Sequence, residues 1–346
     1  LNGTVDTWYR SRITGASNQG SQSTRNINRN TDRDNEFLQA VNDNDIEGVK
    51  KALNSGANVN AVDENGWIPL IYASAKGYIE LVKILLLRGA NANVKNKNGS
   101  TALMSASSRG YLEIVKLLIA KGADINSKNN NGDTALMDSA YNGYLEIVGI
   151  LLSKGANINA RTNDGSTALI NACSKGHLEV VKLLISKGAD VNIKNKNDTT
   201  ALMSVCYEGY LEIAKLLLGK GADANLQNKS GDTALMAACY EGHLEIVKLL
   251  LNKGADANLQ NKTGGTALMI TCTKGNLEIV KILISKGANV NLKTIIAINV
   301  NDNFIPVGST ASEIAEIMSF TDIVDFMSNP DAIEEYRRQY QNRTQQ

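Results

Sequence analysis

The sequence predicts an all-α solenoid in which short helix–turn–helix units stack in one direction. Three observations support this prediction: a motif recurs every 33 residues, each unit holds two apolar segments of helical periodicity, and a glycine follows each segment. At 346 residues the chain is longer than one compact domain usually needs, whereas an array can grow along one axis.

The repeating block begins with a glycine-led turn. Gly99-Ser100-Thr101-Ala102-Leu103-Met104 recurs at 33-residue intervals or their multiples, led by Gly132, Gly165, Gly231 and Gly264. Asp198 leads the copy between Gly165 and Gly231, and Gly66-Trp67-Ile68-Pro69-Leu70-Ile71 is an earlier, more divergent copy. Seven 33-residue repeats are therefore expected over residues 66–296.

Each repeat contains the signals for two helices. In one example, Thr101 to Ser108 predicts a short first helix, Gly110 a turn, and Leu112 to Ala120 an amphipathic second helix. Gly122 follows the second helix, where glycine favours the left-handed conformation that ends helices. Asn98-Gly99 is a favourable pair for a tight turn, so a hairpin is expected to project between units.

The repeated Gly-x-Thr-Ala-Leu-Met…Gly-Tyr/His-Leu-Glu-Ile-Val-Lys-Leu-Leu…Lys-Gly-Ala-Asp/Asn-x-Asn resembles the ankyrin repeat over residues 33 to about 328. The resemblance implies an ankyrin-repeat solenoid with stacked helix pairs, projecting β-hairpin turns and a concave binding face. The family commonly has Pro and His where this chain has residues such as Ala102 and Met104. The polar ties of that histidine are then missing, and lower rigidity between repeats is expected.

The two ends of the chain depart from the repeat. Residues 1–32 form a Ser/Asn/Arg-rich arm that has too little apolar surface to order itself, although Trp8 and Tyr9 offer a means of docking on the first repeat. Residues 33–65 are expected to form an N-terminal capping repeat. Residues 297–307 interrupt the period as an insertion, and residues 308–346 are expected to form a C-terminal capping repeat and tail.

Nothing in the sequence indicates catalysis, a cofactor or a metal site. Cys173, Cys206, Cys239 and Cys272 share one repeat position, but stacked helices lie roughly 8–10 Å apart, beyond the ~7 Å between Cα atoms that a disulfide tolerates. A buried slot for small side chains explains them. His177 and His243 occupy a position that tyrosine fills in other repeats, and no partnered nucleophile accompanies them.

Charge gives little guidance to the partner. The formal net charge is +1, so no overall field attracts nucleic acid, and no apolar run reaches the roughly 18 residues of a membrane span. The predicted hairpins nevertheless carry more basic than acidic residues. The basic ones are Lys95, Lys97, Lys128, Arg161, Lys194, Lys196, Lys229 and Lys262. This basic hairpin row suits an acidic protein segment better than nucleic acid, although solubility alone also explains it.

Candidate contact residues stand where the framework does not dictate the side chain, mainly at the exposed end of the first helix. Tyrosine is enriched in binding surfaces because it buries much area at low entropic cost. Tyr207-Glu208 recurs as Tyr240-Glu241, which predicts an aromatic–acidic patch on adjacent repeats, although recent duplication also explains the recurrence. The full set of candidates is Trp67, Tyr72, Lys76, Arg109, Tyr141, Lys175, Tyr207, Glu208, Tyr240, Glu241 and Lys274.

The leading interpretation is a non-catalytic, monomeric scaffold that binds another protein through its concave face and hairpin tips. The alternative is a targeting module of a larger enzyme, toxin or effector whose active region precedes Leu1. Location stays open. Four unpaired cysteines favour an intracellular protein, whereas a first residue other than Met and several Asn-x-Ser/Thr sites are compatible with export.

Overall fold

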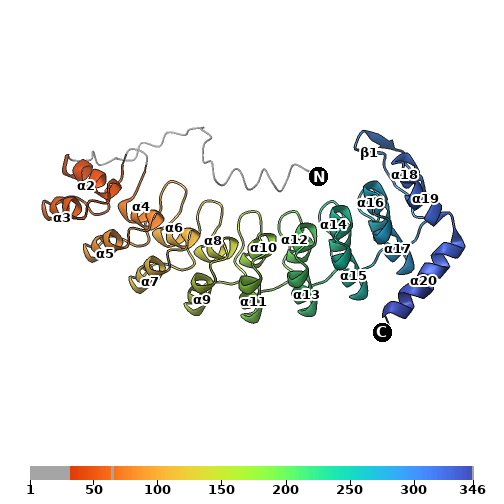
Figure 1. Ribbon diagram of the computed structural model, residues 1–346. Coiled ribbons are helices and arrows are strands. Elements are labelled where there is room, and N and C mark those ends of the chain that lie inside the picture. Colours follow the sequence, from red (N-terminus) through yellow and green to blue (C-terminus); the bar gives the residue numbers. More distant parts are fainter. Residues whose placement is uncertain (1–31, 64–65, 345–346) are drawn as a thin grey trace.

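The computed structural model describes residues 32–63 and 66–344. The helices of this part lie in two rows, and the two rows arch together so that one row lines the concave side (Figure 1). The predicted ankyrin-repeat solenoid is thereby confirmed. The predicted docking of Trp8 and Tyr9 falls outside the described residues.

We call the helices of the concave row inner helices and those of the other row outer helices. The inner helices are α2 (Asp32–Asn42), α4 (Pro69–Lys76), α6 (Ala102–Arg109), α8 (Ala135–Tyr141), α10 (Ala168–Ser174), α12 (Ala201–Glu208), α14 (Ala234–Glu241), α16 (Ala267–Lys274) and α18 (Ala311–Ile317). The outer helices are α3 (Ile46–Asn54), α5 (Ile79–Leu87), α7 (Leu112–Ala120), α9 (Leu145–Ser153), α11 (Leu178–Ser186), α13 (Leu211–Gly219), α15 (Leu244–Asn252), α17 (Leu277–Ser285) and α19 (Thr321–Met327).

The threonine of the repeated motif starts each inner helix from α6 to α16. Thr101 lies just before α6, not within it as the sequence suggested, and its hydroxyl oxygen accepts a hydrogen bond from the Met104 amide at 3.3 Å. This side chain satisfies one of the amides that the first turn of a helix leaves without a partner. In α4, Ile68 takes this position without a side-chain bond, and Pro69 starts the helix with its fixed φ.

The turn between the two helices joins neighbouring repeats through a ring that packs on glycine. Gly110 has a φ of 79°, and a Cβ built on it would lie 2.7 Å from the ring of Tyr144 in the next repeat. Glycine is required there both by its left-handed conformation and by the close approach of the ring. The other ring-on-glycine pairs are Gly77–Tyr111, Gly143–His177, Gly176–Tyr210, Gly209–His243 and Gly275–Phe320. At Gly242 the next repeat supplies Asn276 instead.

An asparagine after each outer helix from α3 to α15 hydrogen-bonds the following repeat. The side-chain oxygen of Asn126 accepts from the Asn157 amide at 2.8 Å, and its side-chain nitrogen donates to the Gly155 carbonyl at 3.1 Å. The oxygen contact recurs at each junction from Asn60 to Asn258, and we call this series the asparagine ladder. Its members are Asn60, Asn93, Asn126, Asn159, Asn192, Asn225 and Asn258. The ladder supplies polar ties between neighbouring repeats.

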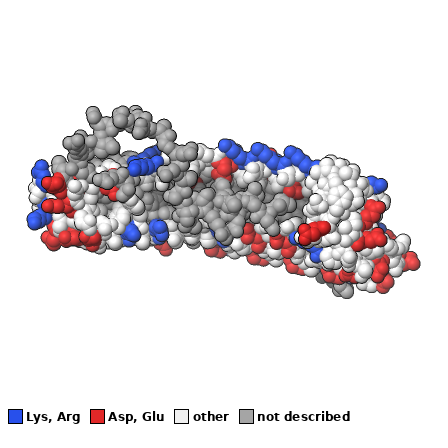
Figure 2. Space-filling model, turned by 90° about the horizontal axis from the view of Figure 1, so that it is seen from above, with Lys and Arg blue, Asp and Glu red and all other residues white. Residues whose placement is uncertain are grey.

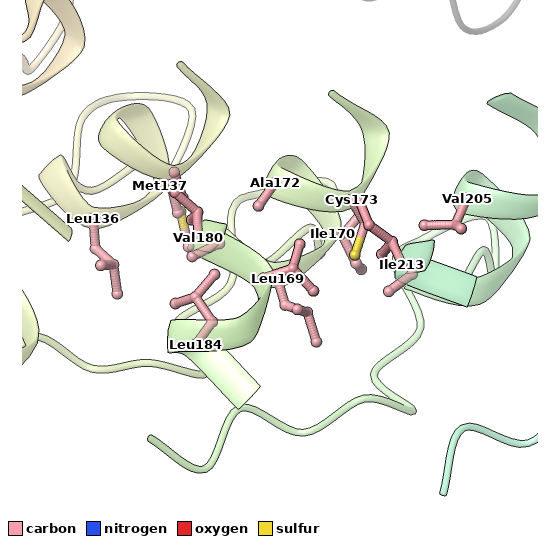
Figure 3. Close-up of a cluster of buried hydrophobic side chains, with 14 of the residues drawn as sticks. Leu136, Met137, Leu169, Ile170, Ala172, Cys173, Val180, Leu184, Val205 and Ile213 are labelled. Atoms are coloured by element: carbon pink, nitrogen blue, oxygen red, sulfur yellow. The ribbon is translucent and has the colours of Figure 1, made fainter. Parts of the chain in front are cut away.

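The apolar core runs through the stack without interruption between repeats. Figure 3 shows Cys173 of α10 beside Ile170 and next to Ile213 of the neighbouring repeat. Cys173 and Val205 are 0% exposed, which shows how completely adjacent repeats bury one another. Burial of this kind stabilises by roughly 25 cal/mol per Å² of apolar area. The core therefore couples each repeat to both neighbours.

The C-terminal end is more elaborate than a simple cap. The predicted insertion forms a β-hairpin of β1 (Ile298–Val300) and β2 (Asn303–Ile305), paired antiparallel with Val300 opposite Asn303. A final helix, α20 (Pro330–Thr344), follows the α18–α19 pair and packs against α17. Among the described residues, no helix has the length and apolar character needed to cross a membrane.

Removal of residues 297–346 should loosen the array from its new end. The cut exposes the apolar faces of α16 and α17 and removes the Phe320 ring from Gly275. We expect native-state hydrogen exchange to quicken most in α16 and α17 and progressively less toward α2, because each repeat contacts only its neighbours. Equal acceleration in every repeat would contradict a linear array.

Candidate partner-binding surface

The candidate tyrosines lie at the ends of inner helices, where the helix meets the turn. Tyr141 is the last residue of α8, and Tyr207 and Tyr240 occupy the last turns of α12 and α14. The apolar residues of these helices are buried in the core, whereas the tyrosines of the last turns are half-buried or exposed. The helices that carry them belong to the row that lines the concave side (Figure 1). The repeat thus places these side chains in a row.

Each of these tyrosines contacts a charged residue of the following repeat. The Lys175 Nζ lies 5.0 Å from the centroid of the Tyr141 ring, and the Lys274 Nζ lies 3.6 Å from that of Tyr240. A cation at this distance from an aromatic face is attracted by the ring quadrupole. We call the row of tyrosines with these charged partners the tyrosine row.

Tyr207 has an acidic partner instead of a basic one. Partial burial first, and then the charge and hydrogen bond of Glu241, raise the pKa of Tyr207 above its usual value. The acid that hydrogen-bonds the Tyr207 side chain therefore comes from the next repeat, whereas Glu208 acts on it through its charge alone. Tyr207 is still 39% exposed, and Glu208 beside it is exposed.

A second aromatic group lies at the N-terminal end. Trp67, which is 50% exposed, meets Tyr72 edge-to-face at 5.3 Å between ring centroids. The Tyr72 hydroxyl donates to the Asn42 side chain at 2.8 Å, and the Lys76 Nζ lies 5.5 Å from the Tyr72 ring. The structure thus brings together three predicted residues here, far along the array from Tyr207. Arg109, on α6 between the two groups, is exposed.

The residues of the basic hairpin row fall into two groups with different roles. Lys95 donates to the Lys128 carbonyl at 2.8 Å, and Lys128 donates to the Arg161 carbonyl at 2.9 Å. Arg161, Lys194, Gln227 and Gln260 continue this chain of bonds, each to the next repeat. These basic residues tie the projecting turns together. By contrast, Lys196, Lys229 and Lys262 lie at the turn tips and are exposed.

The histidines have a structural role that the sequence did not reveal. The Nε2 atom of His177 lies 2.9 Å from the Tyr141 carbonyl oxygen, and that of His243 lies 3.0 Å from the Tyr207 carbonyl oxygen. Each ring also packs on a glycine of the preceding repeat. They therefore hold the backbone of two tyrosines in the tyrosine row.

All four cysteines are free and buried. Burial raises the pKa of the Cys239 and Cys272 thiols to about 12 and also raises the pKa of Cys173 and Cys206. A thiol in this state is a poor nucleophile, because the thiolate is the reactive form. Over residues 32–63 and 66–344, no three His, Cys, Asp or Glu side chains form a group that could hold a metal ion.

Sequence reasoning missed an aromatic cluster on the outer face. Tyr336 and Tyr340 of α20 stack at 6.1 Å between ring centroids, and the Lys286 Nζ lies 5.3 Å from the Tyr340 ring. Together with outer helices they line a groove of ≈ 470 Å³. Its lining residues are Leu211, Lys215, Leu244, Glu245, Lys248, Leu249, Asn252, Glu278, Ile282, Tyr336 and Tyr340. The helical spacing of Ile333, Tyr336 and Tyr340 was the available signal.

Two comparisons with known proteins bear on this geometry. The sequence model of a family described as ankyrin repeats (3 copies) matches residues 37–129, 78–162, 155–228 and 202–294. Protein VAPYRIN-LIKE from Medicago truncatula is 50% identical over 44 residues, which is 13% of this chain and 10% of that protein. The chain therefore matches only a tenth of the length of this relative.

The four thiols should stay unreactive in the folded protein. At pH 8 we expect the native chain to react far more slowly with a thiol reagent than the denatured chain, in which all four become available. The folded pKa near 12 exceeds the ordinary value of 9.0, so the free energy of unfolding should fall as the pH rises from 9 toward 12. Rapid native labelling, or a mass that shows disulfides, would contradict this.

Proposed function

The chain belongs to the ankyrin-repeat family, a family of protein–protein interaction modules, and from this membership we propose that it is a non-catalytic scaffold that holds a partner protein on its concave side. The tyrosine row carries the proposal. The stack places tyrosines at equivalent positions of several repeats, and a charged residue of the next repeat contacts each of these tyrosines. Preorganised side chains lose less entropy on binding than mobile ones.

The charges along the tyrosine row favour a partner segment with a central cation. Glu208 and Glu241 lie between Lys175 on one side and Lys274 on the other. Glu241 already contacts Tyr207, so Glu208 is the acid with its charge more available to a partner. An arginine or lysine beside a flat apolar group would match Glu208 and the exposed Tyr207 ring.

Tyr207 and Tyr240 should contribute unequally. The Lys274 ammonium covers the Tyr240 ring at 3.6 Å, and Tyr240 is half-buried. A partner group must displace Lys274 or stack beside it. Tyr207 needs no such displacement and should anchor the partner more strongly.

Truncation of the anchor tests this proposal. We expect Tyr207→Ala to weaken partner binding by tenfold or more, equivalent to about 1.4 kcal/mol, and Tyr240→Ala to weaken it less. The partner is first captured on the immobilised chain and identified, and each variant is then titrated by calorimetry. The melting temperatures of both variants should stay close to that of the wild type, because substitutions at exposed positions shift stability by only about 0.5 kcal/mol.

Matched variants separate the tyrosine row from general charge effects. Glu208→Gln on the concave rim should weaken binding, whereas Glu212→Gln on outer helix α13 of the same repeat should not. Tyr207→Phe keeps the ring and loses the hydrogen bond to Glu241, so it should retain most of the affinity. If the Tyr207→Ala and Tyr240→Ala variants both bind the partner with wild-type affinity, the contact surface lies elsewhere.

A further inference from the structure

The last projecting turn is built differently from the others. In the preceding repeat, the Asn261 side-chain oxygen accepts from the amide of Gly265, four residues on. The equivalent closure joins the Thr294 hydroxyl oxygen to the amide of Ser309, which is 15 residues on. The two closures differ by 11 residues, which is the length of the insertion, so the insertion lies wholly within the turn. We call residues 295–308 the long finger.

The long finger exposes large apolar side chains. Phe304 is 61% exposed, Val307 62%, Ile295 60% and Ile296 48%. On the opposite face of its β-hairpin, Ile305 is fully buried against the array, so the long finger is anchored by a different set of residues. The exposed group therefore adds little to folding. Concentrated exposed apolar side chains of this kind mark interaction sites more often than isolated ones do.

The long finger continues the row of turn tips. The amides of Lys229 and Lys262 donate to carbonyls of the preceding turns, and the Ile295 amide makes the same bond to the Thr263 carbonyl at 2.9 Å. Ile295 thus occupies the tip position that lysine holds in the three repeats before it. In Figure 2, basic side chains line one edge of the concave side as far as the uncharged prominence at the place of β1 and α18.

We propose that the turn tips bind an extended acidic protein segment and that the long finger takes a bulky apolar side chain at one end of it. Carboxylates of the segment pair with Lys196, Lys229 and Lys262, and the apolar group packs on Phe304 and Val307. Stacked repeats lie roughly 8–10 Å apart, and a segment in the extended polyproline II conformation advances ~3.1 Å per residue with three residues per turn. Acids at every third residue would therefore lie on one face of the segment and meet successive lysines. This inference rests on the proposed protein-binding function and adds a second contact surface.

Other occupants fit the charges and shape less well. Residues 1–31 contain Arg10, Arg12, Arg25 and Arg29 against one acid, so the lysine tips would repel them. A second copy of the chain could pair only with strands of three residues. The area buried by so short a pairing would fall far below the ~1,000 Å² that a stable interface needs. A membrane would have to bury the turn of the long finger, where Asp302 is exposed.

Selection from a random peptide library tests the inference without a known partner. A phage library of ~12-residue peptides, long enough to span about four turn tips, is panned on the full chain. We expect enrichment of peptides with spaced acids and a terminal bulky apolar residue. When resynthesised, these should bind Phe304→Ala at least tenfold more weakly, and Lys229→Gln and Lys262→Gln each about threefold more weakly at low salt.

Two matched controls should leave peptide binding unchanged. Leu87→Ala removes a side chain that is 74% exposed at the other end of the array, and Lys187→Gln removes an exposed lysine next to an outer helix. Circular dichroism checks that each variant keeps its helical content.

The outcomes separate this inference from the proposed function. Peptides that depend on Tyr207 and not on Phe304 would overturn the long-finger site and leave the tyrosine row in place. Dependence on Phe304 and not on Tyr207 would support the long-finger site, and the tyrosine row would then be tested separately by the partner titration. Failure to enrich any acidic–apolar peptide would overturn the inference. So would Phe304-dependent co-sedimentation with phosphatidylserine vesicles in the absence of peptide binding, because that result would identify a membrane as the occupant.

Discussion

The structure depends on hydrogen bonds that each repeat supplies to the next. The amide that begins each post-helix turn, such as that of Asp190, finds its acceptor on the asparagine of the preceding repeat, here Asn159. The rings that pack on glycine and the lysine-to-carbonyl bonds between turns also join neighbouring repeats. An isolated repeat would leave these groups without partners, so each repeat depends on its neighbours for its folded structure. Because the joints are alike, side chains at equivalent positions fall into rows.

Because the framework is uniform, recognition of a particular partner depends on the positions at which the side chains differ between repeats. The tyrosine row changes from Lys175 to Glu208 and back to Lys274, while the framework beneath it stays constant. The joints also change toward the C-terminus: Asn276 replaces the ring that packs on glycine elsewhere, the long finger follows, and α20 folds back on α17. Both proposed contact surfaces are concentrated in this half, where the array departs most from its own pattern.

The period of the sequence was enough to predict the fold, because each repeat carries its own helix starts, glycines and apolar faces. It failed where contacts cross between repeats. Glu208 follows Tyr207 in sequence, yet Glu241 contacts the Tyr207 side chain, since the nearest neighbour of a rim residue belongs to the next repeat. Lys95 looked like a free surface charge for the same reason. The packing of α20 had no counterpart in the repeat and could not be inferred from it.

If the asparagine ladder couples the repeats, a substitution at its midpoint should weaken the cooperativity of the whole array. Asn159→Ala removes one cross-repeat acceptor, while Asn197→Ala removes an exposed asparagine whose contact with the next repeat is made by its backbone carbonyl. In urea unfolding, Asn159→Ala should lower the free energy of unfolding by about 0.5–1.5 kcal/mol and broaden or split the transition. Asn197→Ala should leave both unchanged. Identical unfolding curves for the two variants would show that the apolar core alone couples the repeats.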